Sequence, residues 1–344
     1  MLSRCCPCFS AFLILSKLAP VMSRRKPIFA YPFPMKCFLG IDGGGTKTEW
    51  VVLNESGAIV ARGTGPASNP TRIGFPAAFA ALNETCNAAI NSTRIPFEVV
   101  ALCAGLAGTG RPENREQMLQ FLSQRFSNAH VDVRTDLELP LYAMPPGPAM
   151  VLVAGTGSAA IGRDSQGTVK REGGLGPGHS DEGSAFDIGQ AAVSVARTPQ
   201  EPSRAQHDEL ARQIFEHLSC SNWAELDLKS AANPDSVYPR IFPVVAAAAD
   251  SGSDLARSLL QSATQKLAAI CQRLSESLNL AQQSFPLGKT GGTIGRSRFF
   301  DQALDQALLH KLPQAIVSRL SVEPAELAAW IALQSAESKQ GIAS

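Results

Sequence analysis

The fold is decided by one stretch near the start of the chain, Phe38-Leu39-Gly40-Ile41-Asp42-Gly43-Gly44-Gly45-Thr46-Lys47-Thr48. The apolar residues on either side of the glycines predict two strands, over 37–41 and 48–53, joined by a tight turn. Glycine lets a ligand approach the backbone closely, and the amides of such a turn can surround phosphate oxygens. Thr46 adds a hydroxyl donor and Lys47 a positive charge. The stretch therefore predicts a phosphate-binding hairpin, with an ordinary glycine-rich surface hairpin as the alternative.

A second turn of the same character, Gly155-Thr156-Gly157-Ser158, follows the apolar residues 150–153. A phosphate held between two such turns is a more specific pattern than either turn alone. Asp42 ends the first strand and is placed to hold hydrated Mg²⁺, which needs a carboxylate and water more than a full protein cage. By contrast, residues 288–290 only imitate the end of a Walker A loop, because that motif needs glycine where Gln283 stands.

The remaining pattern places these two turns in two similar halves. In the first half we expect further strands over 57–61, 98–103 and 130–134 and helices over 75–90 and 113–126. In the second half we expect strands over 150–153, 158–163 and 168–171, then helices over 255–280, 299–309 and 324–334, with a glycine-rich turn over 288–295. Both halves thus begin with a meander that contains a small-residue turn.

This arrangement predicts an α/β protein of two lobes that face each other across a cleft. The proline-rich stretch 140–148 is the expected boundary. We therefore expect a first lobe over 36–145 and a second lobe over 146–344, with the last helix as a candidate to return to the first lobe. Residues 1–34 are expected to be an extension, either a disordered tail or a mis-annotated start. A targeting segment is the alternative there, because residues 1–36 carry six basic and no acidic residues. The lack of a clean cleavage site argues against it.

Composition narrows the class of protein. The chain has 344 residues, 44% of them hydrophobic, and a net charge of +1, so it lacks the positive field that nucleic acid would require. Its apolar runs fall short of the roughly 18 residues of a membrane-spanning helix. The scattered later cysteines are typical of reduced core thiols, and Cys5, Cys6 and Cys8 lack a Cys/His cluster at metal-ligand spacing. We expect a cytoplasmic protein without nucleic-acid or membrane partners.

Two carboxylates lie where chemistry is expected. Asp136 follows the strand 130–134, and at that edge a carboxylate can accept a proton from a sugar hydroxyl. Its alternative role is to cap the following helix. Asp181 lies in a glycine-rich segment, 173–184, that precedes a helix, where capping is again the alternative.

Taken together, the motifs resemble a known family. The first glycine stretch, Gly155-Thr156-Gly157-Ser158, Gly173-Gly174-Leu175-Gly176 and Asp181-Glu182-Gly183-Ser184 are similar in order and spacing to the BadF/BadG/BcrA/BcrD ATPase family, in its N-acetylglucosamine kinase-like branch. The resemblance runs from about Met35 to the C-terminus. It implies two ribonuclease H-like lobes of the actin-like ATPase fold, which close over ATP and a sugar.

The resemblance also implies roles for individual residues. ATP would be bound by the first turn, the second turn and a late turn, through Gly43, Gly44, Gly45, Thr46, Lys47, Thr156, Gly157, Gly291 and Gly292. The sugar would be bound by Asn69, Gly108, Asp136 and Asp181, with Asp136 as the catalytic base for the 6-hydroxyl. Asp42 would hold Mg²⁺ through water. The implied cofactors are thus ATP and Mg²⁺.

The leading hypothesis is an ATP-dependent amino-sugar kinase. Leu175 stands where kinases of this branch often have tryptophan, and Ser180 replaces the usual glycine before Asp181, so the acceptor stays open among N-acetylglucosamine, glucosamine and N-acetylmuramic acid. One alternative is the ATPase activator of a 2-hydroxyacyl-CoA dehydratase or benzoyl-CoA reductase system, whose iron–sulfur cysteine pair is missing from the expected folded region. The other is a non-catalytic sugar-binding regulator. Whether two copies form a homodimer is also left open.

Overall fold

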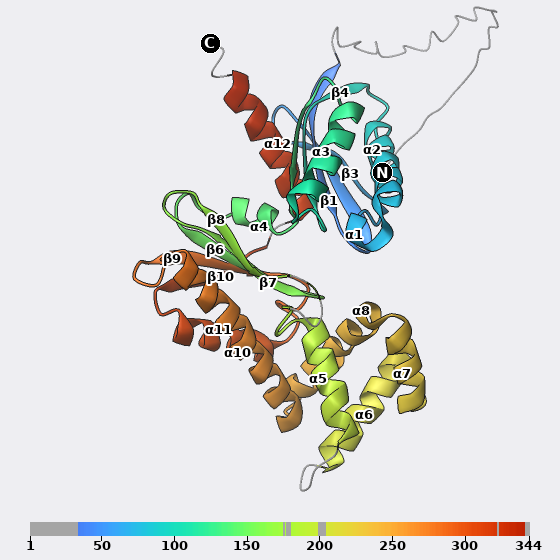
Figure 1. Cartoon of the computed structure of the whole chain (residues 1–344), viewed down its shortest axis with the longest axis vertical. Coiled ribbons are helices and arrows are strands. Elements are labelled where there is room, and N and C mark those ends of the chain that lie inside the picture. Colours follow the sequence, from blue (N-terminus) through green and yellow to red (C-terminus); the bar gives the residue numbers. More distant parts are fainter. Residues whose placement is uncertain (1–33, 175, 177–179, 199–203, 322, 341–344) are drawn as a thin grey trace, which may run out of the picture. The chain divides into compact units, whose positions relative to one another are not determined.

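The computed structural model describes residues 34–174, 176, 180–198, 204–321 and 323–340 (Figure 1). Within them the strands are β1 (Met35–Gly43), β2 (Lys47–Asn54), β3 (Ile59–Pro66), β4 (Phe97–Leu106), β5 (His130–Arg134), β6 (Ala149–Ala154), β7 (Ser158–Arg163), β8 (Val169–Gly173), β9 (Phe285–Thr290) and β10 (Ala315–Arg319). They form two five-stranded sheets, in the orders β3-β2-β1-β4-β5 and β10-β9-β6-β7-β8.

The two sheets share one topology. In each, the first three strands form an antiparallel meander, and the last two run parallel to the first strand of that meander. This repetition follows from the two halves of the sequence, since each begins with two apolar runs joined by a small-residue turn. The expected α/β class is confirmed, and so are the helix at 75–90 and the strands at 130–134 and 158–163.

Helices occupy most of the remaining described chain. They are α1 (Pro70–Ile73), α2 (Phe75–Ile90), α3 (Pro112–Arg125), α4 (Glu138–Tyr142), α5 (Ala185–Arg197), α6 (Arg204–Leu218), α7 (Trp223–Ala232), α8 (Pro234–Val237), a 3₁₀ turn (Tyr238–Ile241), α9 (Phe242–Asp250), α10 (Asp254–Ser277), α11 (Arg298–Lys311) and α12 (Pro324–Gln340). In the described part of the chain, no helix is long and apolar enough to cross a membrane.

The first sheet is covered on both faces because its central strand is apolar on both. Along β1, Leu39 and Ile41 are buried in a core with α2 and α3, whereas Phe38 is buried in a separate core with α12. This period-two alternation is the expected behaviour of a strand between two helical layers. The C-terminal helix thus packs on the sheet formed by the N-terminal strands (Figure 1).

Gly40 makes this close packing of α12 possible. A Cβ atom at position 40 would overlap the backbone oxygen of Ala325 and the backbone nitrogen of Ala329. These are main-chain atoms of α12, which cannot move aside without shifting the helix. The glycine in the first apolar run is therefore required by the packing of the last helix.

The second sheet has one large and one small core. One face packs on α5, α10 and α11, and the other is covered by Leu141 and Met144 from the connection between the sheets. Part of the stretch 140–148, expected to be only a boundary, forms the short helix α4.

Two further expectations for the second half were incomplete. The glycine-rich turn expected from residue 288 begins only at Gly291, because residues 288–290 pair within β9. The edge strand β10 was not expected; it is five residues long and only Ala315 is fully buried, with Val317 packed against the same core. The proposed extension, apart from Pro34, lies outside the described residues.

Gly40→Ala should lower the free energy of unfolding by about 3 kcal/mol or more, because the new methyl group forces α12 away from β1. Gly167→Ala is the matched control, since a Cβ there meets nothing within 4 Å but its φ of 82° is strained. That strain alone should cost about 1–2 kcal/mol. Urea unfolding of both variants measures the difference, and equal losses would contradict the close approach of α12.

Candidate active site

The first glycine turn is tied to two other loops. It closes through a hydrogen bond from the Gly44 amide to the Lys47 oxygen, 2.9 Å long. The Gly43 oxygen accepts from the Ala107 amide at 2.8 Å, and the Gly44 oxygen accepts from the Ser68 amide at 3.1 Å. The backbone of this turn therefore positions both the loop after β3 and the loop after β4.

Asp42 lies in the middle of the sheet at the end of β1, opposite Glu49 on β2 and beside Gly105 on β4. The pKa of its carboxyl is raised to about 7, mainly by burial and further by the negative charges of Asp136 and Glu49, against the lowering effect of Lys47. Lys47 itself is exposed, with its Nζ 2.6 Å from Oε1 of Glu49. An excess of carboxylates at this point suits a bound cation.

Asn69 and Gly108 lie directly against each other. The Asn69 side-chain oxygen caps α1 by accepting from the amide of Thr71 at 2.9 Å and from its hydroxyl at 2.7 Å. Gly108 has a φ of 85°, and a Cβ there would overlap the same Asn69 oxygen. Glycine is required at this position, and with its oxygen engaged the Asn69 amide group is left as the donor for a ligand.

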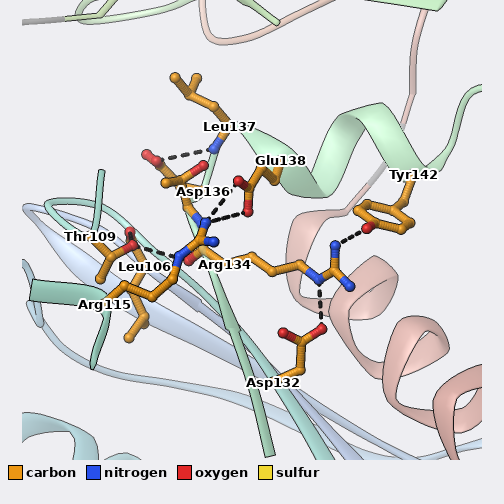
Figure 2. A network of polar contacts seen from close by, with 10 residues as sticks. Leu106, Thr109, Arg115, Asp132, Arg134, Asp136, Leu137, Glu138 and Tyr142 are labelled. Carbon is orange, nitrogen blue, oxygen red and sulfur yellow. Dashed lines mark hydrogen bonds and ion pairs between the residues drawn. The ribbon is translucent and has the colours of Figure 1, made fainter. Parts of the chain in front are cut away.

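Asp136 lies between β5 and α4, where a polar network fixes the chain (Figure 2). Its Oδ1 accepts from the Leu137 amide at 3.0 Å. The next acidic residue, Glu138, accepts from the Thr135 amide at 3.1 Å and from Nη2 of Arg115 at 2.7 Å. The segment around Asp136 is thus held on both sides.

The position of Asp136 does not support a capping role. The N-cap residue of α4 is Leu137, and no side chain caps that helix. Burial is the largest effect on the pKa of the Asp136 carboxyl and raises it, while the Leu137 amide and the charge of Arg171 lower it and Glu138 raises it. A carboxyl of raised pKa next to the Asn69 and Asp42 loops fits a general base.

The second glycine turn lies between the late turn and the start of α5. Its Gly155 amide bonds to the Gly157 oxygen at 2.9 Å, and the Gly155 oxygen accepts from the Ala185 amide at 2.9 Å. Gly291, with a φ of 111°, approaches Ala154 so closely that a Cβ would overlap the Ala154 oxygen. Thr156, Gly157, Gly291 and Gly292 are therefore brought together.

Asp181 joins this group. Its Oδ1 accepts from the Ser158 amide at 3.3 Å, and a Cβ on Gly157 would come within 2.9 Å of its Oδ2. Burial raises the pKa of the Asp181 carboxyl and the charge of Asp235 raises it further, whereas the Ser158 amide lowers it. Ser184 rather than Asp181 caps α5. Ser180 is described, and Leu175 lies outside the described residues.

The candidate residues thus form two groups, one on each sheet. Asp42, the first turn, Asn69, Gly108 and Asp136 belong to the first, and Thr156, Gly157, Asp181, Gly291 and Gly292 belong to the second. The groups are joined by an ion pair of 2.6 Å between Arg72 on α1 and Asp235 on α8. They are also joined by Arg171 on β8, which reaches the loop containing Gly110.

Sequence reasoning missed these joining residues. The partners Arg72 and Asp235 are 163 positions apart, and no local pattern marks a pair that only the fold brings together. The sequence places Arg72 only three residues after the candidate sugar ligand Asn69, which marks it as close to the site but does not identify its partner.

Comparison with known proteins agrees with this arrangement. The N-acetyl-D-glucosamine kinase of Dictyostelium discoideum is 26% identical over 317 residues, which cover 87% of this chain and 98% of that protein. The N-acetylmuramic acid/N-acetylglucosamine kinase of Clostridium acetobutylicum is 24% identical over 270 residues, which cover 77% of this chain and 88% of that protein.

The fold is shared with solved structures. A protein from Chromobacterium violaceum assigned as an N-acetylglucosamine kinase superposes with a TM-score of 0.68 at 24% identity, covering 87% of this chain and 99% of that one. The expected fold of two ribonuclease H-like lobes is thereby confirmed. Residues 39–331 match one family along most of the chain, and the protein therefore belongs to the BadF/BadG/BcrA/BcrD ATPase family.

Proposed function

We propose that the protein is an ATP-dependent kinase that transfers the γ-phosphate of ATP to the 6-hydroxyl of an amino sugar. The observation that carries this proposal is the position of Asp136, a carboxyl of raised pKa that shares one end of the first sheet with the Asn69 loop and the first glycine turn. That the nucleotide is ATP is inferred from membership of an ATPase family. That the acceptor is an amino sugar is inferred from the relatives named as N-acetylglucosamine kinases.

In the proposed reaction, Asp136 accepts the proton of the sugar 6-hydroxyl. The 6-oxygen forms a bond to the γ-phosphorus while the bond from that phosphorus to the bridging oxygen of ADP breaks. The Asn69 amide group and Gly108 would orient the sugar, and Asp181 would accept hydrogen bonds from its other hydroxyls. Positioning and charge neutralisation supply most of the rate.

The two glycine turns would hold the triphosphate. In the first turn, Gly43 and Gly44 would let the phosphates approach the backbone closely, and Gly45, Thr46 and Lys47 would supply donors. Thr156 and Gly157 would supply donors from the second turn, with Gly291 and Gly292 under the adenosine. Asp42 fits a magnesium ion bound through water, because Asp136 and Glu49 add negative charge around it. Bound Mg²⁺ neutralises charge on the phosphates.

The cysteines favour a kinase in the cytoplasm over an activator ATPase. Cys37, Cys86, Cys103, Cys220 and Cys271 are free thiols and are buried in the described part of the chain. Burial raises the pKa of the Cys37 thiol to about 11 and of the Cys86, Cys103 and Cys271 thiols to about 12. Buried neutral thiols suit a reducing compartment and are poorly placed to share an iron–sulfur cluster between two subunits.

The purified protein should release ADP from ATP and Mg²⁺ only when an amino sugar is present. The measurement compares no sugar, N-acetylglucosamine, glucosamine, N-acetylmuramic acid and glucose. ADP release that is the same with and without every sugar would favour the activator ATPase. Sugar binding without any ADP release would favour a regulator.

Asp136→Asn should lower kcat by about 10²- to 10⁴-fold, because the 6-hydroxyl loses its proton acceptor. Nucleotide affinity should stay close to that of the wild type. The unfolding temperature should not fall, because burial raises the pKa of the Asp136 carboxyl and the neutral amide removes that cost. Asp132→Asn is the control, since Asp132 is a nearby carboxylate that pairs with Arg134 on the same strand. Full activity of Asp136→Asn would end its assignment as the base.

Magnesium affinity should fall about tenfold for each pH unit below 7 and level off above it. Asp42 has a pKa of about 7 in the free protein, so below that pH the cation must displace a proton. Titration of ADP formation with Mg²⁺ between pH 5.5 and 8.5 measures this slope. Asp42→Asn should weaken Mg²⁺ binding and remove the slope; an unchanged slope would contradict the site.

The same pKa predicts a change in stability. The pKa of the Asp42 carboxyl is above its ordinary value of 3.8, so folding favours the protonated form. That contribution is complete below pH 3.8 and is lost as the pH rises through 7. Asp42→Asn should therefore raise the unfolding temperature more at pH 8 than at pH 5 in protein free of Mg²⁺. Calorimetry at the two pH values measures this, and equal shifts would contradict it.

A further inference from the structure

Arg171 is a cation at the candidate site whose guanidinium forms no direct ion pair with the described residues. It lies on β8 of the second sheet, where its backbone pairs with Ile161, and its side chain is exposed. Among the residues that the structure describes, its guanidinium forms no hydrogen bond or ion pair. Other arginines nearby are engaged: Arg72 pairs with Asp235, and Arg115 pairs with Glu138. A guanidinium left free beside a binding site is a candidate to bind an anionic part of a ligand.

The side chain of Arg171 points across to the first sheet. Its Nη1 would lie 3.0 Å from a Cβ placed on Gly110. Gly110 belongs to the same loop as Gly108, which lies against Asn69. Arg171 therefore reaches the loop that would line the sugar.

Arg171 is also close to the proposed base. Its positive charge lowers the pKa of the Asp136 carboxyl and so favours the carboxylate. The chain after β8 also lies beside the same segment, since a Cβ on Gly174 would lie 3.5 Å from Cδ1 of Leu137. The other charged groups that act on Asp136 and Asp42 here are Glu138 and Glu49, both negative, and Lys47, which pairs with Glu49. Among the described residues, Arg171 is thus the cation that acts on Asp136.

We propose that Arg171 is a further catalytic residue, whose guanidinium binds the phosphoryl group as it passes to the sugar 6-oxygen and then holds the sugar 6-phosphate. This inference rests on the proposed function. A hydroxyl that gives its proton to Asp136 lies within hydrogen-bond reach of it, and the phosphorus that it attacks lies about 3 Å further on. A guanidinium that reaches the loop beside Asp136 is placed to contact the equatorial oxygens.

The role is one of charge stabilisation. The oxygen–phosphorus bond to the sugar forms, the bond to the bridging oxygen breaks, and that electron pair stays on ADP. The hydroxyl proton goes to Asp136, and Arg171 stays protonated throughout. Its planar pair of N–H donors matches two phosphate oxygens, which a lysine would not reproduce in full.

The test compares Arg171→Gln and Arg171→Lys with the wild type. Arg62→Gln is the matched control, since Arg62 is an exposed arginine that pairs with Glu323 and Glu326 and belongs to neither group of site residues. Arg171→Gln should lower kcat about 10²-fold while the KM for N-acetylglucosamine changes less than about threefold. Arg171→Lys should recover part of kcat, and added guanidinium ion should partly rescue Arg171→Gln but not the control.

A binding readout separates catalysis from a structural role. Without nucleotide, Arg171→Gln should bind N-acetylglucosamine 6-phosphate at least about tenfold more weakly than the wild type but bind N-acetylglucosamine normally. Equal losses for both ligands, or wild-type kcat in Arg171→Gln, would overturn the inference and leave the kinase proposal intact. A wild-type protein that turns over no sugar would overturn both. If Arg171→Gln fails to fold, Arg171→Lys is measured in the same two assays.

Discussion

The hydrogen bonds that Gly43 and Gly44 accept from Ala107 and Ser68 are the constraint on which the site depends. They fix the loops after β3 and β4 to the first glycine turn, so that the residues expected to hold phosphate and sugar share one framework. Oγ1 of Thr109, in the loop after β4, donates to the Arg134 oxygen at 3.1 Å and ties the end of β5, before Asp136, to the same framework. Gly43 must be glycine here, because a Cβ would overlap the Ser68 hydroxyl. The Gly44 amide closes the turn on the Lys47 oxygen, and the Gly45 and Thr46 amides are the groups that can face a ligand.

The second sheet repeats the topology of the first and therefore contains a corresponding turn. The second sheet places the Gly155–Gly157 turn at the position that the first turn occupies in its own sheet, and the late turn at Gly291 packs against it. Charge differs between the two halves. The first carries Asp42 and Asp136, whose pKa values burial raises, while the second contributes Arg171. A phosphoryl group transferred between the halves would therefore meet a base from one and a cation from the other.

Much of the fold and of the candidate site was predictable from local sequence. The rest was not predictable, and in each case the cause is physical. The strands around Asp42 and the helix at 75–90 follow from period and turn chemistry, which short segments contain. The strand β10 was missed because a five-residue edge strand with one fully buried residue carries little periodic signal. Neither the close packing of α12 on Gly40 nor the reach of Arg171 to Gly110 has a local signal, because each joins residues far apart in the chain. The roles of Asn69, Gly108 and Asp181 came from a family resemblance and stay proposals.

The central claim is that this framework directs the γ-phosphate to one hydroxyl of an amino sugar. Phosphorus NMR of the products formed from ATP, Mg²⁺ and the sugar that supports ADP release tests it most directly. The account predicts one phosphate monoester per ADP, with its resonance split by the two protons on carbon 6. Inorganic phosphate as the sole partner of ADP, or an ester at another hydroxyl, would contradict it.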